Sequence, residues 1–266
     1  MKVITKYLKI YSHFWKLAFS QGAVYRVDTF FLLISVILYL LQNWTFFSRV
    51  LQSIPSVGGW TIPEYTFLLA TFSLNIGSFK LFYGRTMEDV IDKIFTGQYD
   101  YTLLRPISSR FLSYFCPPLV KGIFTNILNI IFLIFVIFHF HLFTTWSNFF
   151  LYIFYLFIGQ LIIFSFSQMA VTTSFFTNNA SDIYAIFENA WDQAAYPGEA
   201  FTKSTFFILS YVIPIILFAS FPTRVFLGKV TNPLDFFWPM VVAFICLFVS
   251  NNFYKLGIKN YTSAGG

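Results

Sequence analysis

Residues 122–181 read GIFTNILNIIFLIFVIFHFHLFTTWSNFFLYIFYLFIGQLIIFSFSQMAVTTSFFTNNAS, a stretch without a single Asp, Glu, Lys or Arg. A helix needs about 20 apolar residues to cross about 30 Å of hydrocarbon, so this stretch is long enough for two crossings. Over the whole chain 11% of residues are charged and 57% are hydrophobic, whereas an ordinary soluble domain carries charge on about a quarter of its residues. The sequence therefore predicts an all-α protein that crosses the membrane several times.

The hydropathy pattern predicts six spans in a single transmembrane domain, 1–266, because no polar stretch is long enough to form a soluble core. The domain would consist of an interfacial helix at 1–22, a six-span bundle at 27–254 and a cytoplasmic tail at 255–266. The second span is the weakest, since Glu64, Asn75 and Lys80 interrupt it. The spans are expected at residues 27–47, 62–83, 119–140, 148–176, 203–221 and 236–254.

The positive charges orient these spans. With the N-terminus in the cytoplasm, the inner segments are 1–26, 84–118, 177–202 and 255–266. All but three of the 17 Lys and Arg residues then lie in or beside inner segments, and the exceptions are Arg49, Arg224 and Lys229. Because Lys and Arg are enriched on the cytoplasmic side of membrane proteins, both termini are predicted to be cytoplasmic.

The first 22 residues form an amphipathic pattern. At helical spacing one face is basic and the other is apolar and aromatic. The basic face carries Lys2, Lys6, Lys9, His13 and Lys16. This pattern predicts a helix that lies in the membrane plane, with its lysines toward anionic headgroups. A helix packed on a soluble core would show the same pattern, but the chain offers no such core.

Residues 85–95, RTMEDVIDKIF, predict a short amphipathic helix in the first long inner segment. Thr86 and Asp89 resemble a capping box, and Gly97 stands where a helix would stop. The apolar face comprises Met87, Val90, Ile91, Ile94 and Phe95, and the polar face comprises Arg85, Glu88, Asp89, Asp92 and Lys93. The helix either lies along the membrane as a docking surface or packs on its own bundle.

The segment at 177–202 repeats this pattern with an acidic polar side. Ile183, Ile186, Phe187, Ala190 and Trp191 form its apolar stripe, beside Asp182, Glu188 and Asp192. No basic residue follows these acids before Lys203. Two amphipathic helices on the cytoplasmic side are a pattern suited to a soluble partner, with structural packing as the alternative.

After the first of these helices the chain reads TGQYDYTLLRP at 96–106. This matches a Gly-x-x-Asp-x-x-Leu-x-Arg/Lys-Pro signature through Gly97, Asp100, Leu103, Arg105 and Pro106. Pro214, Phe221-Pro222, the Leu-Gly-Lys at 227–229 and the tail YTSAGG at 261–266 are further similarities. In this order, the features resemble the permease subunits of type-2 ATP-binding-cassette (ABC) transporters over almost the whole chain.

The resemblance implies a subunit with six spans that pairs with a second permease, identical or homologous, in a bacterial cytoplasmic membrane. It also implies cytoplasmic coupling helices that contact ATPase subunits, at residues 85–96 and 181–192. The segment between the last two spans, at 221–235, is expected to dip back into the outer leaflet. The implied coupling residues are Arg85, Glu88, Asp89, Ile91, Asp92, Phe95, Asp182, Phe187, Glu188 and Trp191.

The chain shows no catalytic motif of its own. Its only Gly-Lys pair, Gly228-Lys229, is followed by Val230 and forms no phosphate-binding loop. ATP is therefore expected on a partner subunit, and no cofactor is expected here. His139 and His141 are two residues apart and diverge on a helix, so no metal site is expected. We attribute the net charge of +6 to contact with the lipid bilayer, and we do not expect the chain to bind nucleic acid.

Polar residues inside the expected spans are the remaining functional candidates, because such groups seek partners or water instead of lipid. Asn126 and Asn129 share a face of the third span, and Ser165, Gln168 and Thr172 share a face of the fourth. They either bond neighbouring helices or line a translocation path. We expect a non-enzymatic permease subunit of an ABC exporter. A non-transporting membrane structural or assembly protein is the alternative.

Overall fold

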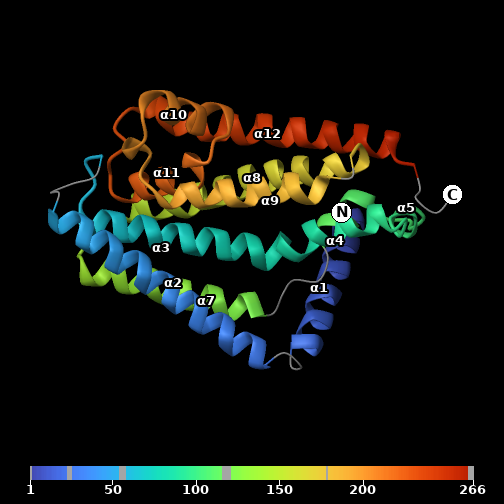
Figure 1. Ribbon diagram of the computed structural model, residues 1–266, viewed down its shortest axis with the longest axis horizontal. Coiled ribbons are helices and arrows are strands. Elements are labelled where there is room, and N and C mark those ends of the chain that lie inside the picture. The colour runs from blue at the N-terminus through green and yellow to red at the C-terminus, as the bar shows by residue number, and fades with distance from the viewer. Residues whose placement is uncertain (1, 23–25, 54–57, 116–120, 178, 263–266) are drawn as a thin grey trace.

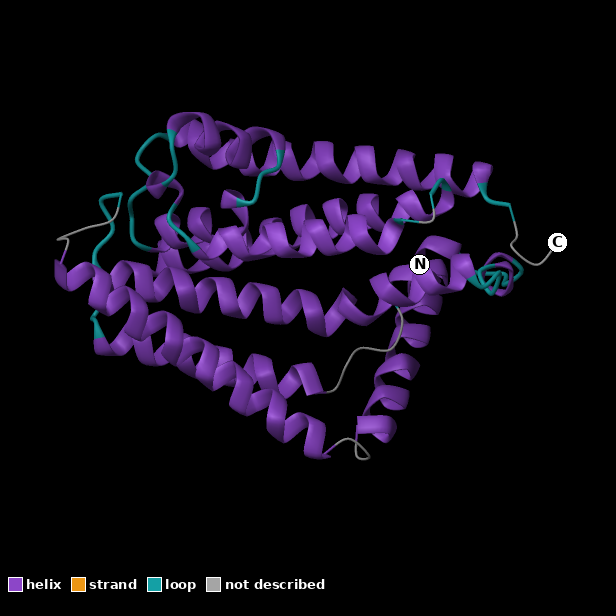
Figure 2. Ribbon diagram, in the orientation of Figure 1, coloured by secondary structure: helices purple, strands orange, loops and turns teal. Residues whose placement is uncertain are grey.

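The structure is a computed structural model, and it describes residues 2–22, 26–53, 58–115, 121–177 and 179–262. Every regular element in these ranges is helical (Figure 2). The long helices run side by side along the long axis, and α1 stands across them (Figure 1). The helices are α1 Lys2–Gly22, α2 Arg26–Ser53, α3 Ile62–Phe79, α4 Arg85–Phe95, α5 Asp100–Leu103, α6 Ser109–Tyr114, α7 Lys121–His139, α8 Trp146–Thr172, α9 Ala180–Trp191, α10 Lys203–Phe207, α11 Ile216–Phe226 and α12 Pro233–Asn260.

Four helices of the described part are long and apolar enough to cross a membrane. They cover Val27–Phe46, Gly122–His139, Trp146–Phe175 and Pro233–Asn260. A fifth candidate consists of two helical pieces, Lys203–Val212 and Ile216–Phe226, which are bent by 98°. These helices confirm the predicted class, an all-helical protein with several candidate spans. A total of six spans remains a prediction.

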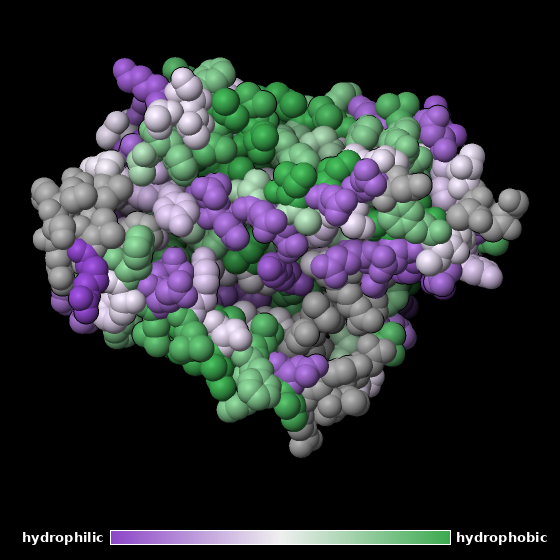
Figure 3. Space-filling model, in the orientation of Figure 1, coloured by the Kyte–Doolittle hydropathy of each residue, from purple (hydrophilic) through white to green (hydrophobic). Residues whose placement is uncertain are grey.

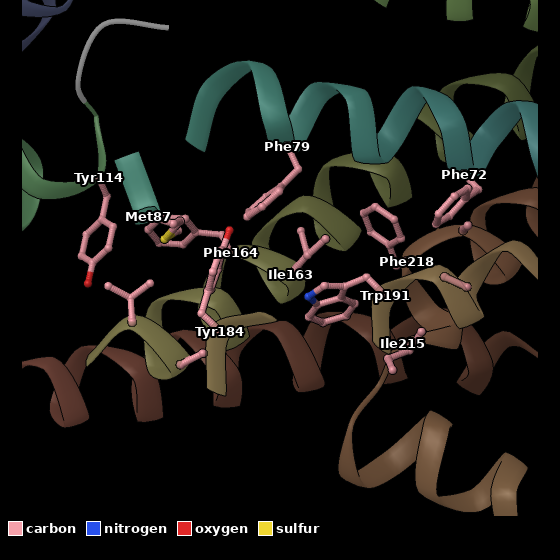
Figure 4. Packing of buried hydrophobic residues seen from close by; sticks show 14 of the residues in the cluster. Phe72, Phe79, Met87, Tyr114, Ile163, Phe164, Tyr184, Trp191, Ile215 and Phe218 are labelled. Atoms are coloured by element: carbon pink, nitrogen blue, oxygen red, sulfur yellow. The ribbon is translucent and has the colours of Figure 1, made fainter. Parts of the chain in front are cut away.

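Helix α3 is the centre of the bundle. Most of its side chains are buried, including Phe72 and Phe79. In the close-up of the core, these two rings lie above Ile163 of α8, Trp191 of α9 and Phe218 of α11 (Figure 4). The polar residues that interrupt the predicted second span have partners: the buried Asn75 donates to the Phe218 carbonyl, Glu64 pairs with Lys229, and Lys80, just beyond α3, pairs with Glu188.

Helix α3 continues into α4 through a π-helical turn, Lys80–Gly84. The predicted capping box at Thr86 and Asp89 is therefore wrong, because a helix that runs on from a preceding one has no free first turn to cap. The Thr86 hydroxyl is buried and donates to the Tyr83 carbonyl, 2.6 Å away. The predicted stop is confirmed, since Gly97 has a φ of 71°, a conformation that favours glycine.

The predicted fifth span at 203–221 is not one continuous helix. Its first piece ends at Val212, and the chain resumes as α11 at Ile216, bent by 98°. Pro214 lies at the break; its ring provides no backbone donor and disfavours a helical conformation at the preceding residue. The proline therefore explains why an apolar run of this length fails to form a straight span. The expected re-entrant segment at 221–235 is likewise divided between the ends of α11 and α12.

The segment at 177–202 does not stay at one end of the bundle, as the predicted inner segment required. It begins near Phe176, which stacks on Phe253 close to the end of α12. It ends at Glu199, whose carboxylate accepts from Trp60 Nε1 at 2.9 Å. A Cβ on Gly58 would lie 2.8 Å from the Glu199 carbonyl carbon, so the two backbones also touch. The segment thus runs the length of the bundle, from the α4 end to the end that holds Trp60, here called the Trp60 end.

Helix α1 attaches to the α4 end through aromatic rings. Tyr7 packs on Phe111 of α6 with ring centroids 4.7 Å apart, and Trp15 packs on Phe82 at 6.2 Å. The described lysines of α1 are exposed. An orientation across the long helices and an exposed basic face are the features that an interfacial helix needs. Residues 263–266 of the predicted tail lie outside the described part, and α12 extends to Asn260.

Candidate functional site

Helix α9 and the 3-10 turn after it, Asp192–Ala195, present a polar surface along the side of the bundle. Tyr184, Trp191 and Ala194 are buried against the core. Away from the core the segment carries the exposed Ile186 and five polar residues, here called the polar stripe, of which Glu188 is half-buried and the others are exposed: Asp182, Glu188, Asn189, Asp192 and Gln193. In Figure 3, hydrophilic residues gather along the middle of this face between hydrophobic regions above and below.

The beginning of the polar stripe meets α4. Together they enclose a pocket of about 320 Å³, which the acidic side chains of Glu88, Asp92 and Glu188 line. Lys80 Nζ lies 3.5 Å from Glu188 Oε1. Burial, and then the charge of Glu188, raise the pKa of the Glu88 carboxyl above its usual range. The two segments predicted as coupling helices are thus neighbours, and their shared surface is acidic.

The predicted coupling residues separate into buried apolar and accessible acidic groups. Ile91 is 3% exposed and Trp191 is 1% exposed, while Phe95 and Phe187 are half-buried and pack against the same core. These four side chains pack against the bundle, which is the geometry of the packing alternative, and docking of an ATPase on these helices stays a prediction. Glu88, Asp92 and Asp182 are exposed, and Asp89 and Glu188 are half-buried. The side chain of Arg85 lies outside the described part.

Asn126 and Asn129 of α7 bond across to α3. Ser78 Oγ donates to Asn126 Oδ1 at 3.1 Å, and Asn129 Nδ2 donates to the Ser73 carbonyl at 2.8 Å. Gly77 makes this approach possible, because a Cβ there would lie 2.8 Å from Asn129 Nδ2. Both asparagines are buried. Both side chains therefore have the geometry expected if they bond neighbouring helices.

Gln168 of α8 anchors a polar contact between three helices. Its Oε1 accepts from Arg110 Nη2 at 2.7 Å, and Arg110 Nη1 donates to Asn251 Oδ1 of α12 at 2.9 Å. Burial lowers the pKa of the Arg110 guanidinium. Ser165 and Thr172, also buried, donate to carbonyls of their own helix. The sequence pattern identified Gln168, but no periodicity could indicate its distant partners.

A cluster of charges at the Trp60 end was also missed. Lys229 Nζ lies 2.8 Å from Glu64 Oε2 and 4.9 Å from the centre of the Trp60 ring. Arg224 pairs with Glu199 at 3.6 Å. The sequence marks Lys229 and Arg224 as exceptions to the positive-inside trend. Two basic residues on the outer side could have suggested acidic partners there. The sequence analysis assigns Glu199 to the cytoplasmic end, however, so it could not predict this pairing.

The described residues contain no group of three or more His, Cys, Asp or Glu side chains that could hold a metal ion. His139 stacks on Phe135 with ring centroids 5.2 Å apart. The expectation that ATP binds to a partner remains a prediction.

A bundle of long apolar helices with internal polar contacts defines a multi-pass helical membrane protein. A family model described as "ABC-2 family transporter protein" matches residues 31–265. The chain belongs to the ABC-2 transporter family, a family of ABC transporter membrane components, and membership implies association with an ABC ATPase. The resemblance drawn from the sequence is thereby confirmed. The chain matched none of the curated proteins and none of the solved structures with which it was compared.

Proposed function

We propose that this chain is the permease subunit of an ABC exporter in a bacterial cytoplasmic membrane, with both termini in the cytoplasm. ATP binds and is hydrolysed on separate ATPase subunits, and a second permease, identical or homologous, completes the pathway. Family membership supports the class. The polar stripe is the single observation that supports the pathway.

The polar stripe supports a partner or an aqueous path because lipid is a poor neighbour for it. A charged residue facing the bilayer centre costs about 2.5–3.5 kcal/mol on insertion scales. Asp192 and Glu188 lie on a segment that runs beside α8, the longest uncharged helix. We infer that α9 and its continuation to Ala200 form the fifth crossing, and that the polar stripe faces the second permease or the substrate path.

The remaining crossings in this proposal are α2, α3, α7, α8 and α12. The bent pair Lys203–Val212 and Ile216–Phe226 then enters from the outer side and returns to it. The bond between Thr144 Oγ1 and the Phe226 carbonyl, 2.9 Å long, supports this arrangement because it holds the end of α11 at the loop between α7 and α8. The charged cluster of Glu64, Lys229 and Glu199 would lie at the outer surface.

Coupling in this proposal uses the acidic surface between α4 and α9. Glu88, Asp92 and Asp182 are exposed there, whereas the apolar face of α4 holds the helix against the core. Because α4 continues α3 through the turn Lys80–Gly84, a push on α4 is transmitted along a largely buried helix. Repacking of such a helix is one way to alternate access.

The test is retention of an ATPase. The tagged full-length chain is purified from membranes of its source cell in a neutral detergent, and bound vanadate-sensitive ATP hydrolysis is measured. Asp92→Lys should lower the retained activity about tenfold or more, because reversing a charge in an interface creates repulsion. Asp235→Lys, a matched reversal near the Trp60 end, should retain it. If the unchanged chain retains no ATPase, the proposal fails and a structural or assembly role is favoured.

A further inference from the structure

A second hollow lies on the other side of Lys80 from the acidic pocket. It has a volume of about 340 Å³ and is formed by α2, α3 and α7, with Asp192 at its edge. Its walls are mainly apolar and are built from Leu32, Val36 and Ile76 together with the ring of Phe72. A volume of this size falls within the range of small-molecule sites, which are mostly apolar with a few placed polar groups.

Two buried polar atoms of residues that line this cavity have no hydrogen-bond partner among the described residues. They are Ser73 Oγ and Asn129 Oδ1, in residues that are 5% and 2% exposed. A buried polar atom without a partner costs about 1–3 kcal/mol, so a group that bonds to it gains correspondingly. The acyl chain of a bilayer lipid could not supply such a bond. The cavity is therefore better suited to a ligand that brings a positive charge or a hydrogen-bond donor near these two oxygens.

The charges at the cavity edge favour a cation. Lys80 Nζ lies 3.5 Å from Glu188, so its charge has a carboxylate partner. Asp192 is exposed and makes no ion pair within 4.0 Å with any residue that the structure describes. Lys80 and Asp192 are the charged residues of the lining, and Glu188, which lies outside it, is the ion-pair partner of Lys80, so Asp192 is left as the charge without an ion pair. The rings of Tyr39 and Phe72 also line the cavity, and aromatic faces attract organic cations.

We propose that this cavity binds a lipophilic organic cation, with its apolar body between α2, α3 and α7 and its positive group beside Asp192. The inference rests on the proposed function only for the step of transport, in which the bound cation would be the exported substrate. An anionic lipid is a poorer occupant, because its phosphate would meet the carboxylate of Asp192. Binding itself requires no ATPase.

The test uses two probes of the same shape and opposite charge. The full-length chain is purified in a neutral maltoside detergent, and binding of radiolabelled tetraphenylphosphonium is compared with that of tetraphenylborate. The cation should bind at least about tenfold more tightly. Asp192→Asn should remove about tenfold or more of that affinity, since a charge partner is lost, and Asp192→Glu should keep most of it.

The controls separate the effect of the Asp192 charge from the effects of cavity volume and of folding. Val36→Trp should abolish binding of the cation by filling the cavity while leaving Asp192 in place. Asp28→Asn, an equal charge change at an exposed position of α2 outside the lining, should bind like the unchanged chain. Circular dichroism and gel filtration verify that each variant is folded.

Equal affinity for the two probes, or full affinity in folded Asp192→Asn, would overturn the cation site. Neither result depends on ATPase retention. Failure of this inference is thus distinguishable from failure of the proposed function, which the retention experiment tests separately.

Discussion

Helices α8 and α9 pack side by side, yet they differ in where their polar residues lie. Helix α8 contains no charged residue, and its polar residues Ser165, Gln168 and Thr172 are buried and form hydrogen bonds inside the bundle. Helix α9 is short and exposes acids such as Asp182 along its outer side. In the proposed arrangement, apolar composition reports contact with lipid and not depth in the bundle. A helix whose exposed side meets protein or water can keep a polar face.

The largest expected effect comes from placing a charge on each helix in turn. Ile162→Asp in α8 buries an unpaired carboxylate in the apolar cluster around Leu217 and Val242. A loss of about 3 kcal/mol or more is expected, enough to prevent recovery of folded protein. Asn189→Asp on the exposed side of α9 should give a normal yield. Yield and gel-filtration profile in detergent measure both, and equal losses would mean that α9 is no more tolerant than α8.

A second test asks what the exposed side of α9 faces. In a chain with Cys116 and Cys246 replaced by Ala, Gln193→Cys is oxidised in native membranes and compared with Phe157→Cys, an exposed position of α8. If an identical copy lies against the polar stripe, the first variant should form a disulfide-linked dimer as its main product. The second should stay monomeric because its neighbour is lipid. A monomer in both cases would rule out an identical copy at this face.

A smaller effect on stability is expected from a third test, which compares the hydrogen-bonded amide of Gln168 with the exposed amide of Gln193. Gln168→Leu removes the acceptor of Arg110 and leaves a half-buried guanidinium with one side-chain partner fewer. This should lower the stability of the chain by about 1–3 kcal/mol. The same change at the exposed Gln193, Gln193→Leu, should change it by less than about 0.5 kcal/mol. Thermal unfolding in detergent measures the difference, and equal shifts would contradict the structural role of Gln168.

The same contrast explains how much the sequence could predict. Helices α7 and α8 were placed within a few residues, because their apolar runs are uninterrupted and bounded by polar residues. Helix α1 was placed by its two-faced pattern. The path of α9 was missed because Glu188 and Asp192 look like loop residues when only lipid is considered as a neighbour. Their surroundings depend on contacts with α3 and α4, distant in sequence.

The error at 203–221 has the opposite cause. The run is apolar enough to read as a span, and Pro214 was the only local sign of the bend. A proline is tolerated in many membrane helices, so it could not decide the matter alone. Among the site candidates, the residue types were recognised, but their orientation was not. Ile91 and Phe95 satisfy a docking pattern and a core pattern equally well, and only the bundle behind α4 decides between them.

The smallest expected effect concerns pH at the contact between α4 and α9. Burial and the charge of Glu188 raise the pKa of Glu88 in the folded chain. The folded state then holds a proton that the unfolded state has already released, so stability falls as pH rises from the ordinary Glu range through the raised pKa. Glu88→Gln should flatten this part of the pH profile of the thermal midpoint. Glu188→Gln should flatten it partly, because burial of Glu88 remains when the neighbouring charge is removed. An unchanged slope in both variants would show that Glu88 ionises in α4 as it would in water, and that the acidic surface there is more open than its packing against α9 indicates.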